Sequence, residues 1–230
     1  MRNRKRFPAQ SKNMILGEMA LLVTAVFVMC GVAKGITSRL RMNDYVTTFL
    51  IFVIVLLNVR GGVKLTESYS LSLGSILSVI VGSYTMIRRS DTLSEGIFAL
   101  LSAAGCAGIV FAYSAHFLGE IKLDPRLVAS LLSLLVGLWC AFAARRRFSS
   151  CLFAALFGGF LGSTLYLILF EKHGNIGGNY TFAVMWLGAI AGLVIQYLLT
   201  VLLRAVKSPR ADSYFEAGEM KEEEKPEKRN

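Results

Sequence analysis

The chain has 230 residues, of which 54% are hydrophobic and 17% are charged, and its mean hydropathy is +0.56. So little polar surface excludes a soluble globular domain of this length. The formal net charge of +10 does not indicate nucleic-acid binding, because the Lys and Arg residues stand where apolar segments end. Anionic lipid headgroups are the expected partner of cations in that position.

Apolar segments follow one another from residue 14 to residue 204. A hydrocarbon core of about 30 Å requires about 20 apolar helical residues for each crossing. The apolar runs are continuous and do not alternate with a period of two, which favours helices over a transmembrane barrel. The candidate spans are 14–33, 45–59, 71–87, 96–118, 127–144, 149–170 and 181–203. We predict an all-α, polytopic transmembrane helix bundle with about seven spans.

The distribution of basic residues predicts the orientation of these spans. One set of connections carries 15 Lys and Arg residues, and the alternate set carries five. The first set comprises 34–44, 88–95, 145–148 and the chain from residue 204, and the second comprises 60–70, 119–126 and 171–180. We therefore expect a plasma-membrane protein whose C-terminus lies in the cytoplasm.

The first 13 residues conflict with this orientation, because their five Lys and Arg residues would lie outside if 14–33 crosses the membrane. One alternative is that the first segment lies flat on the inner leaflet, which leaves six spans. A second is that the helices insert in the orientation that the distribution of basic residues disfavours. A start of translation at Met14 would remove residues 1–13 altogether. A cleaved signal peptide is the fourth alternative.

The character of the chain changes after Arg204. Residues 205–230 are polar, and the last ten are mostly acidic and basic residues. Such a segment cannot bury enough apolar area to order itself. We predict a disordered cytoplasmic tail.

Small residues recur every four positions in several of the predicted spans, which places them on one stripe of each helix. Lipid tails are as apolar as leucine, so membrane helices associate through close backbone approach, which small residues permit. The stripes contain Gly74, Ser78 and Gly82; Ala104 and Gly108; Gly158 and Gly162; and Gly188 and Gly192. They predict helices packed against one another. The alternative is that one or more of the stripes bind another membrane protein.

Glu18 and Gln196 are polar residues within predicted spans, where ionisable groups are costly. Glu18 lies one turn into the first span, where it can reach the interface, bind a proton or cation, or pair with another helix. Gln196 in the last span is expected to hydrogen-bond a neighbouring helix.

The predicted outer loops hold His116, Glu120 and Asp124 near a second acidic loop. These groups are candidates for a metal or solute entry site, and the alternative is a set of solvated loop charges in which Asp124 caps the helix that begins at Pro125. The sequence contains no His-Glu-x-x-His, Gly-x-Ser-x-Gly or P-loop motif. We therefore assign no catalytic, cofactor-binding or metal-binding residue. The four cysteines are expected to be small buried hydrophobes.

Four features of residues 14–204 together resemble a known group. A basic loop at 34–41 follows the first span, and Val-Arg-Gly-Gly-Val at 59–63 forms a hairpin after the second. Gly-Gly-Phe-Leu-Gly at 158–162 and a late glycine helix at 188–192 complete the pattern. In these features the chain resembles the YphA-like membrane proteins of spore-forming Gram-positive bacteria. The resemblance implies a bacterial plasma-membrane protein without an assigned activity, and it carries no functional residue over.

Two classes of function are open. The first is a non-enzymatic membrane protein that organises or binds a partner through its small-residue stripes. The second is a small-solute transporter or a transporter subunit. A transporter requires a polar cavity that reaches mid-membrane, whereas a partner-binding protein is expected to have a filled interior.

Overall fold

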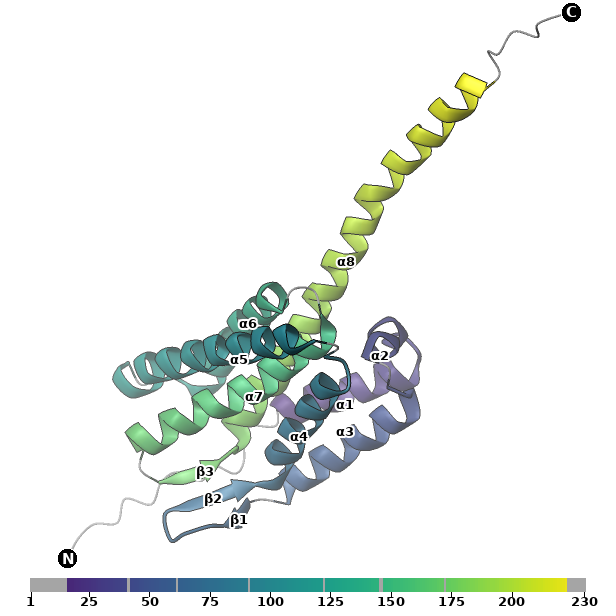
Figure 1. Cartoon of the computed structure of the whole chain (residues 1–230). Helices are drawn as coiled ribbons and strands as arrows, with labels where there is room; N and C mark the ends of the chain where they lie inside the picture. The colour runs from purple at the N-terminus through teal and green to yellow at the C-terminus, as the bar shows by residue number, and fades with distance from the viewer. Residues whose placement is uncertain are drawn as a thin grey trace, which may run out of the picture.

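The computed structural model describes residues 16–40, 42–60, 62–90, 92–121, 123–144, 147–171 and 173–222, with the backbone alone described at 119 and from 204 onward. The basic N-terminal tail lies outside the described residues, as do the last eight residues of the chain, and the four interpretations of that tail stay predictions. The described residues form mainly helices, which Figure 1 shows packed side by side with a small sheet at one end.

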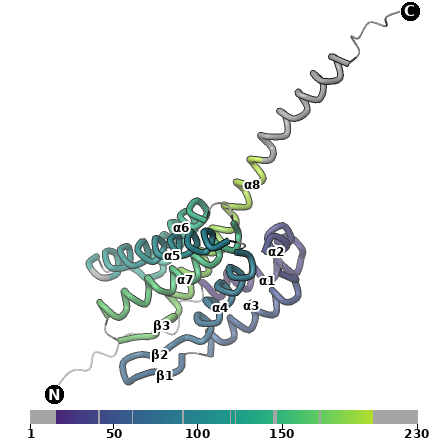
Figure 2. Tube along the Cα trace, in the orientation of Figure 1, coloured from purple at the N-terminus to yellow at the C-terminus, as the bar shows by residue number. Residues whose placement is uncertain are grey.

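The first helices form a sharp corner. Helix α1 (Leu16–Met29) and helix α2 (Lys34–Leu40) are bent by 93°. Gly31 adopts a φ of 75° at this corner, a left-handed conformation that ends a helix readily only at glycine. Helix α3 (Asp44–Val59) then returns beside α1, as the trace in Figure 2 shows.

The later helices are longer. Helix α5 (Leu93–Ser114) continues into the π-helix η1 (Ala115–Glu120), and helix α6 (Pro125–Ala143) follows. Helix α7 (Phe148–Tyr166) continues into the π-helix η2 (Leu167–Glu171). Helix α7 is the centre of the bundle, because it contacts α2, α4, α5, α6 and α8.

The last helix, α8, runs from Asn179 to Glu222. It therefore continues past residue 204, where the sequence predicts that order ends. No proline or glycine interrupts residues 193–208, which lets the apolar helix extend past residue 204 into polar sequence. Beyond that point the helix also includes Pro209.

The mainly helical fold is as predicted, but a small three-stranded sheet accompanies the helices and was not expected. Strand β1 (Gly62–Lys64) pairs antiparallel with β2 (Tyr69–Ser72), and β2 pairs parallel with β3 (Gly174–Ile176). The register aligns Tyr69 with Gly174, so two loops that are about 100 residues apart in the chain lie side by side. Both loops belong to the set that the charge distribution places on one side of the membrane.

The count of seven spans is wrong for the described helices. Four are long and apolar enough to cross a membrane: Leu93–Leu118, Pro125–Ala143, Phe148–Glu171 and Asn179–Leu203. The bent pair α1 and α2 makes a fifth if it is taken as one broken span. The predicted spans at 45–59 and 71–87 are α3, with 16 residues, and α4 (Leu73–Ile87), with 15. At 1.5 Å per residue each extends only about 23 Å, less than the hydrocarbon thickness of about 30 Å.

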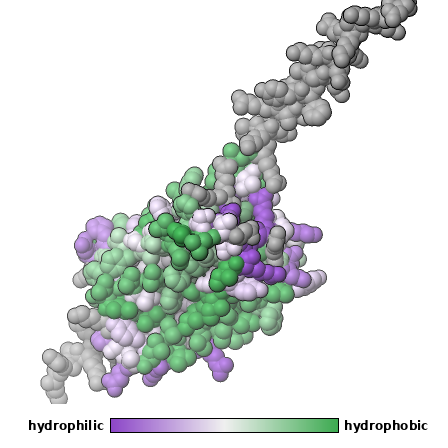
Figure 3. All heavy atoms as spheres, viewed as in Figure 1, coloured by the Kyte–Doolittle hydropathy of each residue, from purple (hydrophilic) through white to green (hydrophobic). Residues whose placement is uncertain are grey.

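The bundle has two chemically different ends. We call the end that holds β1, β2, β3 and η1 the sheet end, and the end that holds Arg39, Arg88 and Arg147 the arginine end. Between them the visible surface is mainly hydrophobic, and hydrophilic side chains gather toward the margins in Figure 3. Apolar side chains such as Leu134, 60% exposed, and Phe142, 65% exposed, face outward on α6. This distribution is the one expected of helices surrounded by lipid.

Candidate functional sites

A buried chain of polar groups joins three elements near the sheet end. The Asn58 side-chain amide on α3 donates to the Glu18 carboxylate on α1 over 2.7 Å. Asn58 Oδ1 in turn accepts from the Ser72 hydroxyl, just before α4, over 2.8 Å. All three side chains are buried. Of the roles open to Glu18, the structure shows pairing with another helix, and Asn58 and Ser72 are partners that sequence reasoning missed.

Two further buried hydrogen bonds connect α4 to Gly177 and to Trp186 of α8. The Ser75 hydroxyl donates to the carbonyl of Gly177 over 2.5 Å, and Trp186 Nε1 donates to the Ser78 hydroxyl over 2.9 Å. Gly177 has a φ of 72°, and a Cβ at this residue would lie 2.7 Å from the Ser75 Cβ. A glycine is therefore required here both by its conformation and by the close approach of α4.

Glycines lie at most of the helix contacts. A Cβ at Gly74 would lie 2.7 Å from the carbonyl of Ile54, and one at Gly158 would lie 2.5 Å from the carbonyl of Ala103. Gly162 meets Ala107 in the same way. Further contacts place Gly82 against Leu156, Gly188 against Val136 and Gly192 against the Cys151 thiol. At Gly74, Gly158 and Gly162 the helices meet backbone to backbone, as small-residue packing requires. At Gly82, Gly188 and Gly192 the glycine makes room for a side chain of the neighbouring helix.

The stripe on α5 is arranged differently. Ala104 and Gly108 are exposed, and nothing lies within 4 Å of a Cβ at Gly108. The α5 carbonyls that lie against α7 belong to their neighbours Ala103 and Ala107. A helix with small residues on two adjacent stripes can pack through either one, and the neighbouring carbonyls of α5 lie against Gly158 and Gly162.

The loop charges of the sheet end remain at the surface. His116 and Glu120 form an exposed pair one helical turn apart, with 2.7 Å between Nδ1 and Oε2. Asp124 accepts from the backbone N–H of Arg126 over 2.9 Å and caps α6 ahead of Pro125, as the sequence predicts. Among the described residues, no three His, Cys, Asp or Glu side chains are placed to hold a metal ion.

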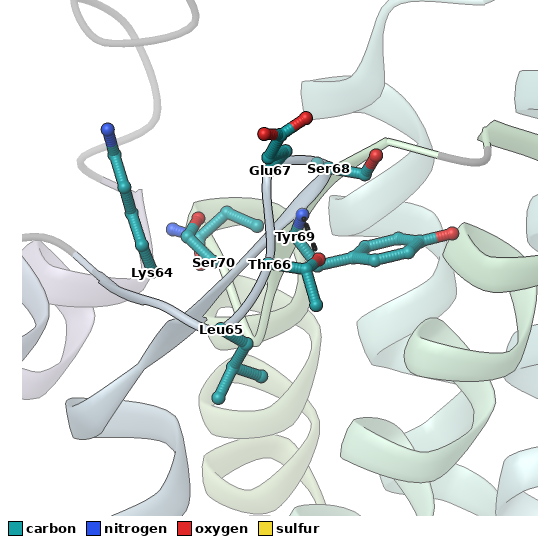
Figure 4. A pocket seen from close by; sticks show the side chains of 9 residues that line it. Lys64, Leu65, Thr66, Glu67, Ser68, Tyr69 and Ser70 are labelled. Carbon is teal, nitrogen blue, oxygen red and sulfur yellow. Dashed lines mark hydrogen bonds between the residues drawn. The ribbon is translucent and has the colours of Figure 1, made fainter.

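A shallow hollow of about 530 Å³ lies beside the hairpin, lined by residues 64–70 with Gly174 and Asn175. Figure 4 shows that its side chains diverge: Lys64, Leu65 and Tyr69 point in different directions. The dashed bond in the figure runs from the Tyr69 N–H to Thr66 Oγ1 over 3.2 Å and shapes the turn itself. The hollow therefore follows from the hairpin's curvature, with no convergent groups to hold a ligand.

At the arginine end, charged groups connect the starts of α5 and α7 with the end of α2. Arg147, which precedes α7, forms an ion pair with Glu95 at the start of α5. The Arg39 guanidinium of α2 lies 4.9 Å from the Phe148 ring centre and 5.5 Å from that of Tyr197. Cation–π contacts of this kind hold an arginine in place while its N–H groups stay available.

Gln196 is fully buried, and neither its amide nitrogen nor its amide oxygen has a hydrogen-bond partner. The bond to a neighbouring helix that the sequence predicts is therefore not formed. An unpaired buried amide is costly, on the order of 1–3 kcal/mol for each group.

Three of the cysteines, Cys106, Cys140 and Cys151, are fully buried free thiols, as expected of small hydrophobes, whereas Cys30 is exposed. The Cys106 and Cys151 thiols pack against Gly158 and Gly192. They contribute to helix packing.

A scan against protein-family models and searches of curated proteins and solved structures each found no match to this chain.

Proposed function

We propose that the chain is a non-enzymatic integral membrane protein that binds a partner membrane protein. The observation that carries this proposal is the contrast between its glycines. Gly74, Gly158 and Gly162 are closed by neighbouring backbone, whereas Gly108 opens outward. The close contacts favour a filled interior, and the outward stripe offers a second helix a surface for close approach.

The proposed partner surface is the exposed face of α5 around Ala104 and Gly108. Within the lipid there is no hydrophobic driving force between helices, so association depends on close packing, which the small residues Ala104 and Gly108 permit. Leu101, 61% exposed, adds apolar surface nearby. Another membrane helix fits this chemistry better than a soluble partner.

The experiment is affinity purification of the tagged full chain from its native membranes, followed by mass spectrometry. Wild type is compared with Gly108→Leu, which fills the stripe, and with Leu131→Phe, a control on the exposed face of α6. We expect one membrane protein to be recovered with wild type and the control and lost with Gly108→Leu. Failure to recover a reproducible partner, or equal recovery with all three chains, would contradict the proposal.

The alternative is a small-solute transporter or transporter subunit, and two observations favour it. Glu18 is a buried carboxylate, and α1 and α2 form a broken helix pair. Transporters place ionisable groups and discontinuous helices at their solute sites. Modification of Glu18 by a water-soluble carbodiimide in native membranes, detected by mass spectrometry, would favour the transporter. Protection of Glu18 favours the filled bundle.

We further propose that the membrane is a bacterial plasma membrane and that the arginine end faces the cytoplasm. The charges of the described side chains support this orientation. The arginine end has five cations against two carboxylates, and the sheet end has three cations against four exposed carboxylates. The first group is Lys34, Arg39, Arg88, Arg89 and Arg147 with Asp44 and Glu95; the second is Arg60, Lys64 and Arg126 with Glu67, Glu120, Asp124 and Glu171. The resemblance to YphA-like proteins stays a prediction.

A further inference from the structure

We propose that the first turn of α7 at the arginine end is a binding site for a phosphate group, supplied by a phospholipid headgroup or by free phosphate. The start of α7 lacks a side-chain cap, since Arg147 takes the N-cap position with no side-chain hydrogen bond to the helix. The first backbone N–H groups of a helix have no partner within it, and they attract anions. Ser149 and Ser150 add two buried hydroxyls to this turn.

Gln196 is a second indication that a ligand binds here, because it is fully buried and both of its amide atoms are unpaired. Two contacts place it level with this turn. One turn earlier on the same face of α8, a Cβ at Gly192 would lie 2.8 Å from the Cys151 thiol of α7. Because α7 and α8 run in opposite directions, Gln196 then faces the turn that precedes Cys151.

The second contact involves Tyr197, the residue that follows Gln196 on α8. Tyr197 and Phe148 share the Arg39 guanidinium, at 5.5 Å and 4.9 Å. Gln196 therefore lies beside Phe148, the first residue of α7. A buried amide that satisfies no protein group is expected to meet a ligand or water, and its Nε2 can donate to a phosphate oxygen.

Charge at this site favours an anion. Arg39 is fixed by two rings rather than by a carboxylate, so among the described residues its contacts leave its positive charge uncompensated. The nearby carboxylate of Glu95 is engaged by Arg147. Guanidinium groups and helix N-termini are the groups that proteins use for phosphate recognition.

The test uses the full chain purified in a neutral detergent. Thermal unfolding and native mass spectrometry are measured with added phosphatidylglycerol, phosphatidylcholine or inorganic phosphate. The variants are Arg39→Gln and Gln196→Met, and Arg126→Gln at the sheet end is the control. We expect phosphatidylglycerol to bind and raise the unfolding temperature of wild type and the control, with at least a tenfold loss of affinity in both site variants.

The outcomes also distinguish the source of the phosphate. If inorganic phosphate produces the same variant-sensitive stabilisation, the site takes free phosphate; if only phosphatidylglycerol does, it takes a headgroup. Equal binding in all four chains, or no binding of any probe, would overturn the proposal, whereas binding of phosphatidylcholine, which carries the same phosphate, supports it only if both site variants weaken that binding. Gln196→Met removes an unpaired amide and keeps the side-chain volume, so it keeps the test valid if Arg39→Gln does not fold.

Discussion

Asn58 and Glu18 are 40 residues apart in the chain, and their side chains meet in a buried hydrogen bond of 2.7 Å. The Asn58 amide uses both of its ends, because its oxygen also accepts from Ser72. This pair ties α1 to α3 and to the start of α4. It explains why a carboxylate is tolerated inside an apolar segment: its desolvation is offset by a direct donor.

Replacing Asn58 by Ala is expected to destabilise the protein by about 2 kcal/mol, because it leaves the Glu18 carboxylate and the Ser72 hydroxyl buried without this partner. Glu18→Gln keeps an acceptor and is expected to cost less. The measurement is detergent-solubilised thermal or denaturant unfolding. Phe49→Ala, on the exposed side of α3, is the control. A loss no greater than that of the control would show that the bond contributes nothing.

Gly158 and Gly108 form a matched pair for the packing of α5. A Cβ at Gly158 would lie 2.5 Å from the Ala103 carbonyl and 2.7 Å from the Cys106 Cβ, so Gly158→Ala is expected to force α5 and α7 apart at a cost of about 1–3 kcal/mol. Gly108→Ala meets open space and is expected to be neutral, or stabilising by up to about 1 kcal/mol through helix propensity. The same unfolding assay measures both. Equal effects would contradict the contact.

Trp186 and Ser78 are joined by a buried bond between Nε1 and the hydroxyl. We expect Trp186→Phe and Ser78→Ala each to lower the free energy of unfolding by about 1 kcal/mol. The double variant is expected to lose less than the sum, because each single change already removes the same bond. Strict additivity in this double-mutant cycle would show that the two residues stabilise the protein independently.

The proposed orientation predicts which loops react from outside the cell. In a Cys30→Ala background, Glu67→Cys in the hairpin is expected to react with a membrane-impermeant maleimide on intact cells. Arg88→Cys is expected to react only after permeabilisation. Cys106, Cys140 and Cys151 are buried and supply a low background. The reverse pattern would place the arginine end outside and overturn the orientation.

The sequence by itself determined where helices form. Continuous apolar runs and helix-ending residues place α5, α6, α7 and the first part of α8 near their predicted ranges, because backbone hydrogen bonding and apolar burial along a helix are local properties. Asp124 and Pro125 likewise mark the start of α6 through adjacent groups alone. The sequence also predicts the bounds of α3 and α4 closely, as 45–59 and 71–87. The error lies in taking such short segments as full spans, since a crossing requires about 20 apolar residues.

Only the tertiary structure decided which groups meet. The pairing of β2 with β3 joins segments about 100 residues apart, and strands of three and four residues carry almost no local signal. The choice of Ala103 over Ala104 as the packing face of α5 depends on the helix it meets. The sequence shows Asn58 only as one polar residue in an apolar run. Its role follows from the placement of Glu18 and Ser72, which nonlocal packing alone sets.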